Sequence, residues 1–113
     1  MKVNYKIWLE QDGAVKAFGK GPYDLLRHIK VCGSLNKACQ SMGISYSKAS
    51  SILIRSESAL GIELLHRAAG GSLGGGSEIT SEGFNLMKSY EKFMQEADLA
   101  IKQLYIEHFE NLI

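Results

Sequence analysis

The fold is decided by residues 34–61, which read SLNKACQSMGISYSKASSILIRSESALG. Ser34 and Ser45 each precede a run with helical periodicity, and a serine hydroxyl in that position caps the first turn of a helix. Each run ends at a glycine, the residue that most often closes a helix C-terminus. The stretch therefore predicts a short helix over 35–41, a tight turn, and a longer helix over about 46–60.

The longer helix has two unlike faces, because successive residues rotate by about 100° around the axis. Its inner face collects Ala49, Leu53, Ser56 and Leu60. Its outer arc carries Ser47, Lys48, Ser51, Arg55 and Ser58. A helix that enters the major groove of DNA needs slim or hydrogen-bonding side chains of this kind. From the pattern alone, an ordinary helical pair with a solvated outer face is an equal alternative.

Upstream, residues 3–10 alternate apolar and polar side chains, and an Asp-Gly step at 12–13 separates them from a second strand-like run. This pattern predicts an N-terminal β-hairpin. The inward positions would be Val3, Tyr5, Ile7 and Leu9, with Trp8 on the other face. Whether this hairpin extends a later sheet or covers the first helix stays open.

A first helix is expected from Pro22, which suits an initial helical position, to its stop at Gly33. One face of that helix is apolar through Leu25, Leu26 and Ile29, so this face is expected to be buried.

Short strands are expected at 64–68 and 78–80, on either side of a segment with five glycines between Gly70 and Gly76. The flanking strands favour a hairpin over a flexible linker. A nucleotide-phosphate loop is the other alternative, but such loops need a helix and usually a Gly-Lys-Ser/Thr step directly after the glycines. Neither follows Gly76.

The last segment, 81–113, reads as one long helix with an apolar stripe too wide for a small body to cover. Pairing with the same helix of a second copy would cover the stripe and give two-fold symmetry. The expected dimer contacts are Phe93, Ala97, Ile101, Leu104, Tyr105, His108, Phe109 and Leu112.

The composition fits one small domain: 113 residues, two cysteines and a net charge of +1. The near-zero charge hides a division, because residues 1–70 carry +5 and residues 71–113 carry −4. Two cysteines and three scattered histidines give neither a disulfide framework nor metal-ligand spacing. We expect a cytosolic protein with no membrane span, metal, cofactor or enzymatic activity.

The order of residues in 34–67, with Glu57, the Leu60-Gly61 step and Arg67, resembles the winged helix-turn-helix of LysR-type regulators. Gly-Ile-Ser-Tyr at 43–46, the later glycine groups, Thr80 and Gly83 are similar to the N-terminal DNA-binding domain of ModE-type molybdate-responsive regulators. The resemblance covers about residues 22–95. It implies a dimeric transcription factor that binds double-stranded DNA through its third helix, with the glycine-rich hairpin at 68–78 as the wing.

The fold class expected is therefore mainly α with small β-hairpins: a hairpin and winged helix-turn-helix over 1–80 and a dimerisation helix over 81–113. The expected DNA contacts are Ser34, Ser45, Tyr46, Ser47, Lys48, Ser51, Arg55, Arg67, Gly70, Gly71, Gly74 and Gly75. Ser34 would place a helix N-terminus on a phosphate. Two alternatives stay open: a protein-interaction module that kept the fold, and an oxyanion-responsive regulator. In the molybdate regulators, oxyanion sensing belongs to further C-terminal domains, so it is not carried over to these residues.

Overall fold

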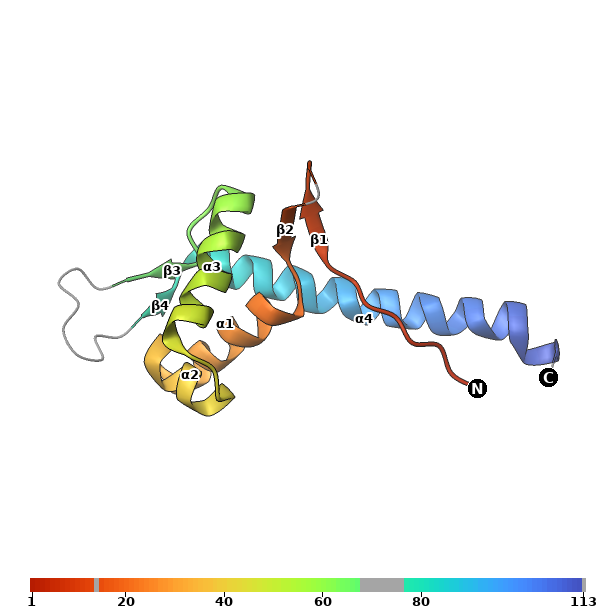
Figure 1. The fold of residues 1–113 in the computed structure, drawn as a ribbon. Coiled ribbons are helices and arrows are strands. Elements are labelled where there is room, and N and C mark those ends of the chain that lie inside the picture. The colour runs from red at the N-terminus through yellow and green to blue at the C-terminus, as the bar shows by residue number, and fades with distance from the viewer. Residues whose placement is uncertain (14, 68–76, 113) are drawn as a thin grey trace.

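The structure, a computed structural model, describes residues 1–13, 15–67 and 77–112. In chain order the elements are β1 (Leu9–Gln11), β2 (Val15–Phe18), α1 (Lys20–Cys32), α2 (Leu35–Met42), α3 (Tyr46–Leu60), β3 (Leu65–His66), β4 (Glu78–Ile79), α4 (Ser81–Phe109) and a 3-10 turn (Glu110–Leu112). Three helices form a body, two small antiparallel hairpins flank it, and α4 runs from the body far to one side (Figure 1). The mainly helical fold with small hairpins is confirmed.

The caps expected between α2 and α3 are present. The Ser34 hydroxyl accepts a hydrogen bond from the Lys37 N–H at 3.1 Å, and the Ser45 hydroxyl accepts one from the Lys48 N–H at the same distance. Gly43 ends α2 with a φ of 69°, in the left-handed region that glycine tolerates best. The helix-turn-helix is therefore fixed by local chemistry at each of its ends.

One hydrophobic core joins all the elements of the body. Its largest fully buried side chains include Phe18, Leu25, Leu26, Ile29, Leu35, Leu53, Leu64 and Leu65. Phe18, at the end of β2, packs edge-on against Tyr90 of α4 with ring centroids 5.2 Å apart. This contact ties the first part of α4 to the body.

The N-terminal hairpin is present, but the extent predicted for its first strand, residues 3–10, is wrong. Only Leu9–Gln11 pairs with β2. Of the four side chains expected inside, Val3, Tyr5 and Leu9 are 44%, 37% and 40% exposed, and Ile7 is half-buried. The reason is the length of the return strand, because β2 has four residues before Gly19 and α1 begin. Residues further upstream therefore have no strand to pair with.

Residues 1–8, called the N-terminal strap below, instead cross α4 and end near its C-terminal half (Figure 1). The Tyr5 hydroxyl donates to the Asp98 carboxylate at 2.6 Å. The Tyr105 hydroxyl donates to the Met1 carbonyl at 3.3 Å. The strap is thus held on α4 at two points.

Two further expectations about the first third of the chain need correction. The N-terminal hairpin neither extends the β3–β4 sheet nor covers only the first helix: it forms its own two-stranded sheet, and β2 packs mainly against α3. α1 begins at Lys20 and not at Pro22, because Gly19 is already its N-cap and accepts from the Tyr23 N–H at 3.0 Å. No helix within the described ranges is both long and apolar enough to cross a membrane.

Candidate nucleic-acid interface

The inner and outer faces of α3 are as the sequence predicts. Ala49, Leu53 and Ser56 are buried against the rest of the body. The predicted contact residues Ser45, Tyr46, Ser47, Lys48, Ser51 and Arg55 are all exposed. The exposed arc of these six residues, together with Ile54 and Ser58, is called the outer face of α3 below.

The outer face of α3 is electropositive. The first turn of α3 holds no acidic residue, and within the part of the chain that the structure describes neither Lys48 nor Arg55 forms an ion pair. Two cations on a surface that holds no acidic side chain, and whose other members are serines, Tyr46 and Ile54, suit an anionic partner.

Ser34 lies apart from the side chains of the outer face. It is 5% exposed and its hydroxyl is engaged in the cap of α2, so only the N-terminal N–H groups of that helix are left to face a phosphate. Lys37, in the first turn of α2, has an exposed side chain at this end of the helix. Lys37 is not among the predicted contacts, although its place three residues after the Ser34 cap already puts a cation in the first turn of a helix.

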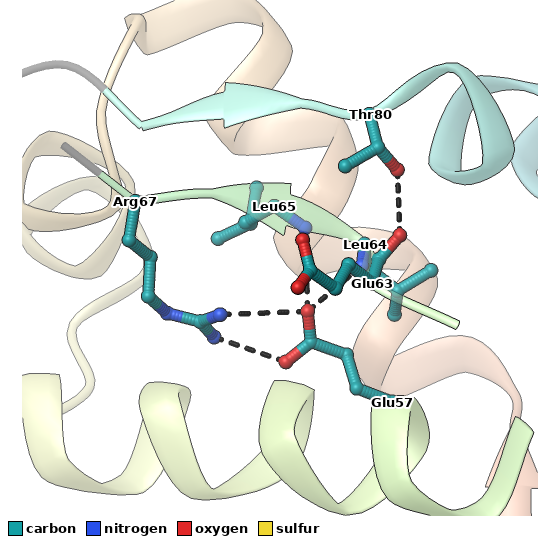
Figure 2. Close-up of polar contacts among 6 residues, drawn as sticks. All are labelled: Glu57, Glu63, Leu64, Leu65, Arg67 and Thr80. Atoms are coloured by element: carbon teal, nitrogen blue, oxygen red, sulfur yellow. Dashed lines mark hydrogen bonds and ion pairs between the residues drawn. The ribbon is translucent and has the colours of Figure 1, made fainter. Parts of the chain in front are cut away.

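Arg67 lies at the base of the β3–β4 hairpin and is held by Glu57 of α3 (Figure 2). Its Nη2 donates to Glu57 Oε1 at 3.2 Å, in an ion pair. The other carboxylate oxygen accepts from the Leu64 N–H at 2.8 Å and lies 3.4 Å from the Leu65 nitrogen and Arg67 Nη1. One carboxylate thus binds the backbone of Leu64 and Leu65 and the side chain of Arg67, all on the segment that enters the β3–β4 hairpin.

Thr80 fastens the other strand of the same hairpin. Its buried hydroxyl donates to the Glu63 carbonyl at 2.6 Å (Figure 2). The same hydroxyl accepts from the Gly83 N–H at 2.9 Å. A Cβ added at Gly83 would lie 2.8 Å from the Leu64 carbonyl oxygen. The hairpin base therefore rests directly on the first turn of α4, which only a glycine permits.

The outer face of α3 lies between two grooves. One, of about 640 Å³, separates α3 from β3 and is lined by Ile54, Ser58, His66 and Arg67 among others. The second, of about 510 Å³, separates α3 from the N-terminal hairpin, where Gln11 and Val15 face Ser51 and Arg55. The N-terminal hairpin therefore borders the same face as the β3–β4 hairpin, which sequence reasoning did not foresee.

The predicted backbone contacts at Gly70, Gly71, Gly74 and Gly75 lie outside the described residues. Among the residues described, no three histidine, cysteine or acidic side chains gather where they could hold a metal ion. Cys39 is buried and its burial raises the pKa of the thiol, which favours the unreactive protonated form.

The predicted dimer contacts divide into two sets along α4. Ala97, Ile101 and Tyr105 are half-buried within the single chain, and Tyr105 contacts the N-terminal strap. Phe93, Leu104, Phe109 and Leu112 are 49%, 52%, 49% and 76% exposed, and His108 is exposed too. Beyond Tyr90, no described residue of α4 is buried.

Comparison with known proteins agrees with this geometry. Residues 23–83 match the family model of the bacterial regulatory helix-turn-helix proteins, lysR family. Over 71 residues the chain is 34% identical to the DNA-binding transcriptional dual regulator ModE of Escherichia coli (strain K12) and to the transcriptional regulator ModE of Shigella flexneri. The match takes in 63% of this chain but 27% of each relative.

The matched region coincides with the structural features described above. It contains α1 from Tyr23 onward, the helix-turn-helix, the Glu57–Arg67 pair and the Thr80 cap that begins α4. The descriptions of the family and of these relatives name regulators and no enzyme. A match over more than half of the chain, on residues that build one continuous fold, shows that the chain belongs to the lysR family of bacterial regulatory helix-turn-helix proteins.

Proposed function

We propose that the protein is a sequence-specific, DNA-binding transcription regulator that acts as a homodimer and places α3 in the major groove. The observation that carries this proposal is the outer face of α3, where serine hydroxyls surround two cations that form no ion pair with any described residue. The major groove, whose width is about 12 Å, admits an α-helix, and hydroxyl and cationic side chains on its exposed face can contact base edges and phosphates.

Lys48 and Arg55 are the proposed anchors. They stand seven residues apart, which is about 10.5 Å along the helix at 1.5 Å per residue. Tyr46, Ser47 and Ser51 add hydroxyl groups near the N-terminal end of α3, where recognition helices contact base edges and phosphates. Ser45 is exposed beside them at the cap.

The β3–β4 hairpin is proposed as the wing. Its base presents Arg67, whose side chain is 40% exposed although it pairs with Glu57. The guanidinium has more donors than the carboxylate uses, so a DNA phosphate beside the major groove can share it. The backbone N–H groups of Gly70, Gly71, Gly74 and Gly75 are the remaining proposed wing contacts.

Dimerisation is proposed through α4. Phe93, Ala97, Ala100, Leu104 and His108 recur at intervals of four and three residues and so share one side of the helix. This side of the helix, called the seam on α4 below, is separate from the positions of Asp98 and Tyr105, which hold the strap. A second copy of α4 packed on this seam would cover it, and two copies would present two outer faces of α3 to two half-sites.

Fluorescence anisotropy on duplex DNA across a salt series tests the proposal. A pool of duplexes selected from random sequence supplies the target. Affinity should fall as salt rises, with a slope of about −0.9 for each phosphate contact. The double variant Lys48→Ala plus Arg55→Ala should bind more weakly with a shallower slope. Lys88→Ala plus Lys92→Ala removes equal charge from exposed positions on α4 and should bind as the wild type does.

Affinity that is insensitive to salt, or equal in the two double variants, would contradict the proposal. The competing function is a module that recruits a protein partner through the N-terminal hairpin or α4. That alternative predicts retention on a partner protein from the source cell and passage through immobilised heparin or DNA. A selected DNA motif without two-fold symmetry would contradict the dimer alone.

A further inference from the structure

A pocket of about 440 Å³ lies where the N-terminal strap passes α1 and α4, away from the outer face of α3. Its walls are largely aromatic. Tyr5 and Trp8 come from the strap, Tyr23 from α1 and Tyr90 from α4. Pockets that hold small molecules have volumes of about 300–1,000 Å³ and apolar walls with a few placed polar groups. This pocket meets both conditions.

The charged groups at the pocket are mostly cationic. Lys6, Lys16 and Lys20 line it, and Asp24 is the acid among them. Lys20 pairs with Asp24 at 3.5 Å, whereas no ion pair in the described chain engages Lys6 or Lys16. The Lys16 Nζ lies 6.0 Å from the centre of the Trp8 ring. The Lys16 ammonium therefore lies over the face of the Trp8 ring, in a cation–π contact at the pocket wall.

The polar ends of three pocket aromatics are already bonded to carboxylates. The pairs are Tyr5 with Asp98, Trp8 with Glu10, and Tyr23 with Glu91. None of these acids lines the pocket. These hydrogen bonds fix the orientation of each ring. They also occupy the hydroxyl and indole N–H groups, which would otherwise be free to donate to a ligand.

We propose that this pocket binds a small planar aromatic anion, such as an aromatic carboxylate. The ring would pack against Trp8 and the tyrosines, and the carboxylate would accept from the Lys16 and Lys6 ammonium groups. A hydrated inorganic oxyanion has no apolar surface to offer these walls, and a neutral aromatic leaves both lysines without a partner. The ligand would touch the strap, α1 and α4 together, so its binding would stabilise the folded chain.

Trp8 is the only tryptophan in the sequence, so its indole N–H gives one assignable signal in ¹H–¹⁵N spectra. The probe is 1-naphthoate, added to the full chain without DNA. Three matched compounds separate its features: 1-naphthamide removes the charge, cyclohexanecarboxylate removes the aromatic ring, and molybdate is an inorganic oxyanion. The proposal predicts a saturable shift with 1-naphthoate and binding at least about tenfold weaker for each of the others.

The variants test the lysines directly. Lys6→Gln plus Lys16→Gln should weaken 1-naphthoate binding by about tenfold, whereas Lys88→Gln plus Lys92→Gln should not change it. The glutamines lie on exposed positions, so the fold is retained in both. A Trp8 signal that does not shift, equal binding of the acid and its amide, tighter binding of molybdate, or equal binding by both double variants would each overturn the proposal. Since no DNA is present, none of these results depends on the proposed DNA binding.

Discussion

Glu57 of α3 and Arg67, directly after β3, form an ion pair at 3.2 Å that connects the proposed recognition helix to the base of the β3–β4 hairpin (Figure 2). The same carboxylate accepts from the Leu64 N–H, so one side chain sets both the backbone and the side chain of the entering strand. The distance between the outer face of α3 and the base of the β3–β4 hairpin therefore depends in part on this acid. Any DNA contact that uses both elements depends on that spacing.

Replacing Glu57 should cost more stability than replacing Arg67. Glu57→Ala leaves the Leu64 N–H, a backbone donor in the core, without its partner, and such losses cost about 1–3 kcal/mol. Arg67→Ala breaks a partly exposed pair worth about 0–1 kcal/mol. Urea unfolding of the two variants measures both changes in the free energy of unfolding.

Glu57→Gln is the control, because its amide oxygen still accepts from the Leu64 N–H while the charge is lost. The free energy of unfolding of Glu57→Gln should lie between those of the wild type and Glu57→Ala. A Glu57→Ala variant no less stable than Arg67→Ala would show that the carboxylate does not hold the strand.

Thr80 offers a second test at the same hairpin. Thr80→Val keeps the shape but removes a hydroxyl that donates to the Glu63 carbonyl and accepts from the Gly83 N–H. Because the residue is 2% exposed, no water replaces those bonds, and we expect a loss of about 1–3 kcal/mol in the free energy of unfolding. Thr80→Ser retains the hydroxyl and should recover most of the loss. Equal unfolding midpoints for valine and serine would refute the bridging role.

Local chemistry explains which parts of this fold the sequence could predict. Ser34, Ser45 and the glycines that follow α2 and α3 act on their own turns, so their positions fix those helices without knowledge of the rest. The outer face of α3 follows from helical periodicity in the same way. The long helix and the short hairpin at Leu65 and Ile79 were predictable for the same reason.

The strap and the Glu57 contacts were not predictable, because they depend on groups distant in sequence. Alternation over 3–10 reports that side chains point in two directions, but it does not say whether a partner strand exists. Tyr5 meets Asp98 across 93 positions, and Glu57 meets Arg67 only after the chain has turned at Gly61. Such pairs follow from the tertiary fold alone.

The seam on α4 should be sensitive to charge. Leu104→Asp places a carboxylate in the middle of the proposed helix pair, where two copies would face each other, so we expect monomers or aggregates in place of a dimer. Gln95→Asp adds the same charge at an exposed position off the seam and should leave the dimer intact. Light scattering after size exclusion measures the mass of each. An unchanged dimer in Leu104→Asp would place the interface elsewhere.

The strap can be tested through the acid that holds it. The hydrogen bond from Tyr5, and next the hydrogen bond from Lys102, lower the pKa of Asp98 below its ordinary value of 3.8. Tyr5→Phe should therefore raise the Asp98 pKa toward that value, as measured by NMR titration of the side-chain carboxyl. Tyr105→Phe removes the other strap contact and should leave the Asp98 pKa in place. An Asp98 pKa that is the same in Tyr5→Phe as in the wild type would show that the strap does not lie on α4 in solution.

Alkaline stability should depend on Tyr23, which connects α1 to α4. Burial, and next the hydrogen bond to Glu91, raise the pKa of Tyr23 from 10.0 to about 12. The unfolded chain then loses this proton at lower pH than the folded chain does, so the contribution of Tyr23 is complete below pH 10 and is lost as the pH rises to about 12. Tyr23→Phe cannot ionise, and the free energy of unfolding should fall less steeply across that interval in urea titrations. Glu91→Gln keeps an acceptor but removes the charge. The slope of its free energy of unfolding against pH should therefore lie between the slopes of the wild type and of Tyr23→Phe. A slope in Tyr23→Phe as steep as in the wild type would assign the alkaline loss to other groups, such as Tyr90, whose pKa is also raised by burial.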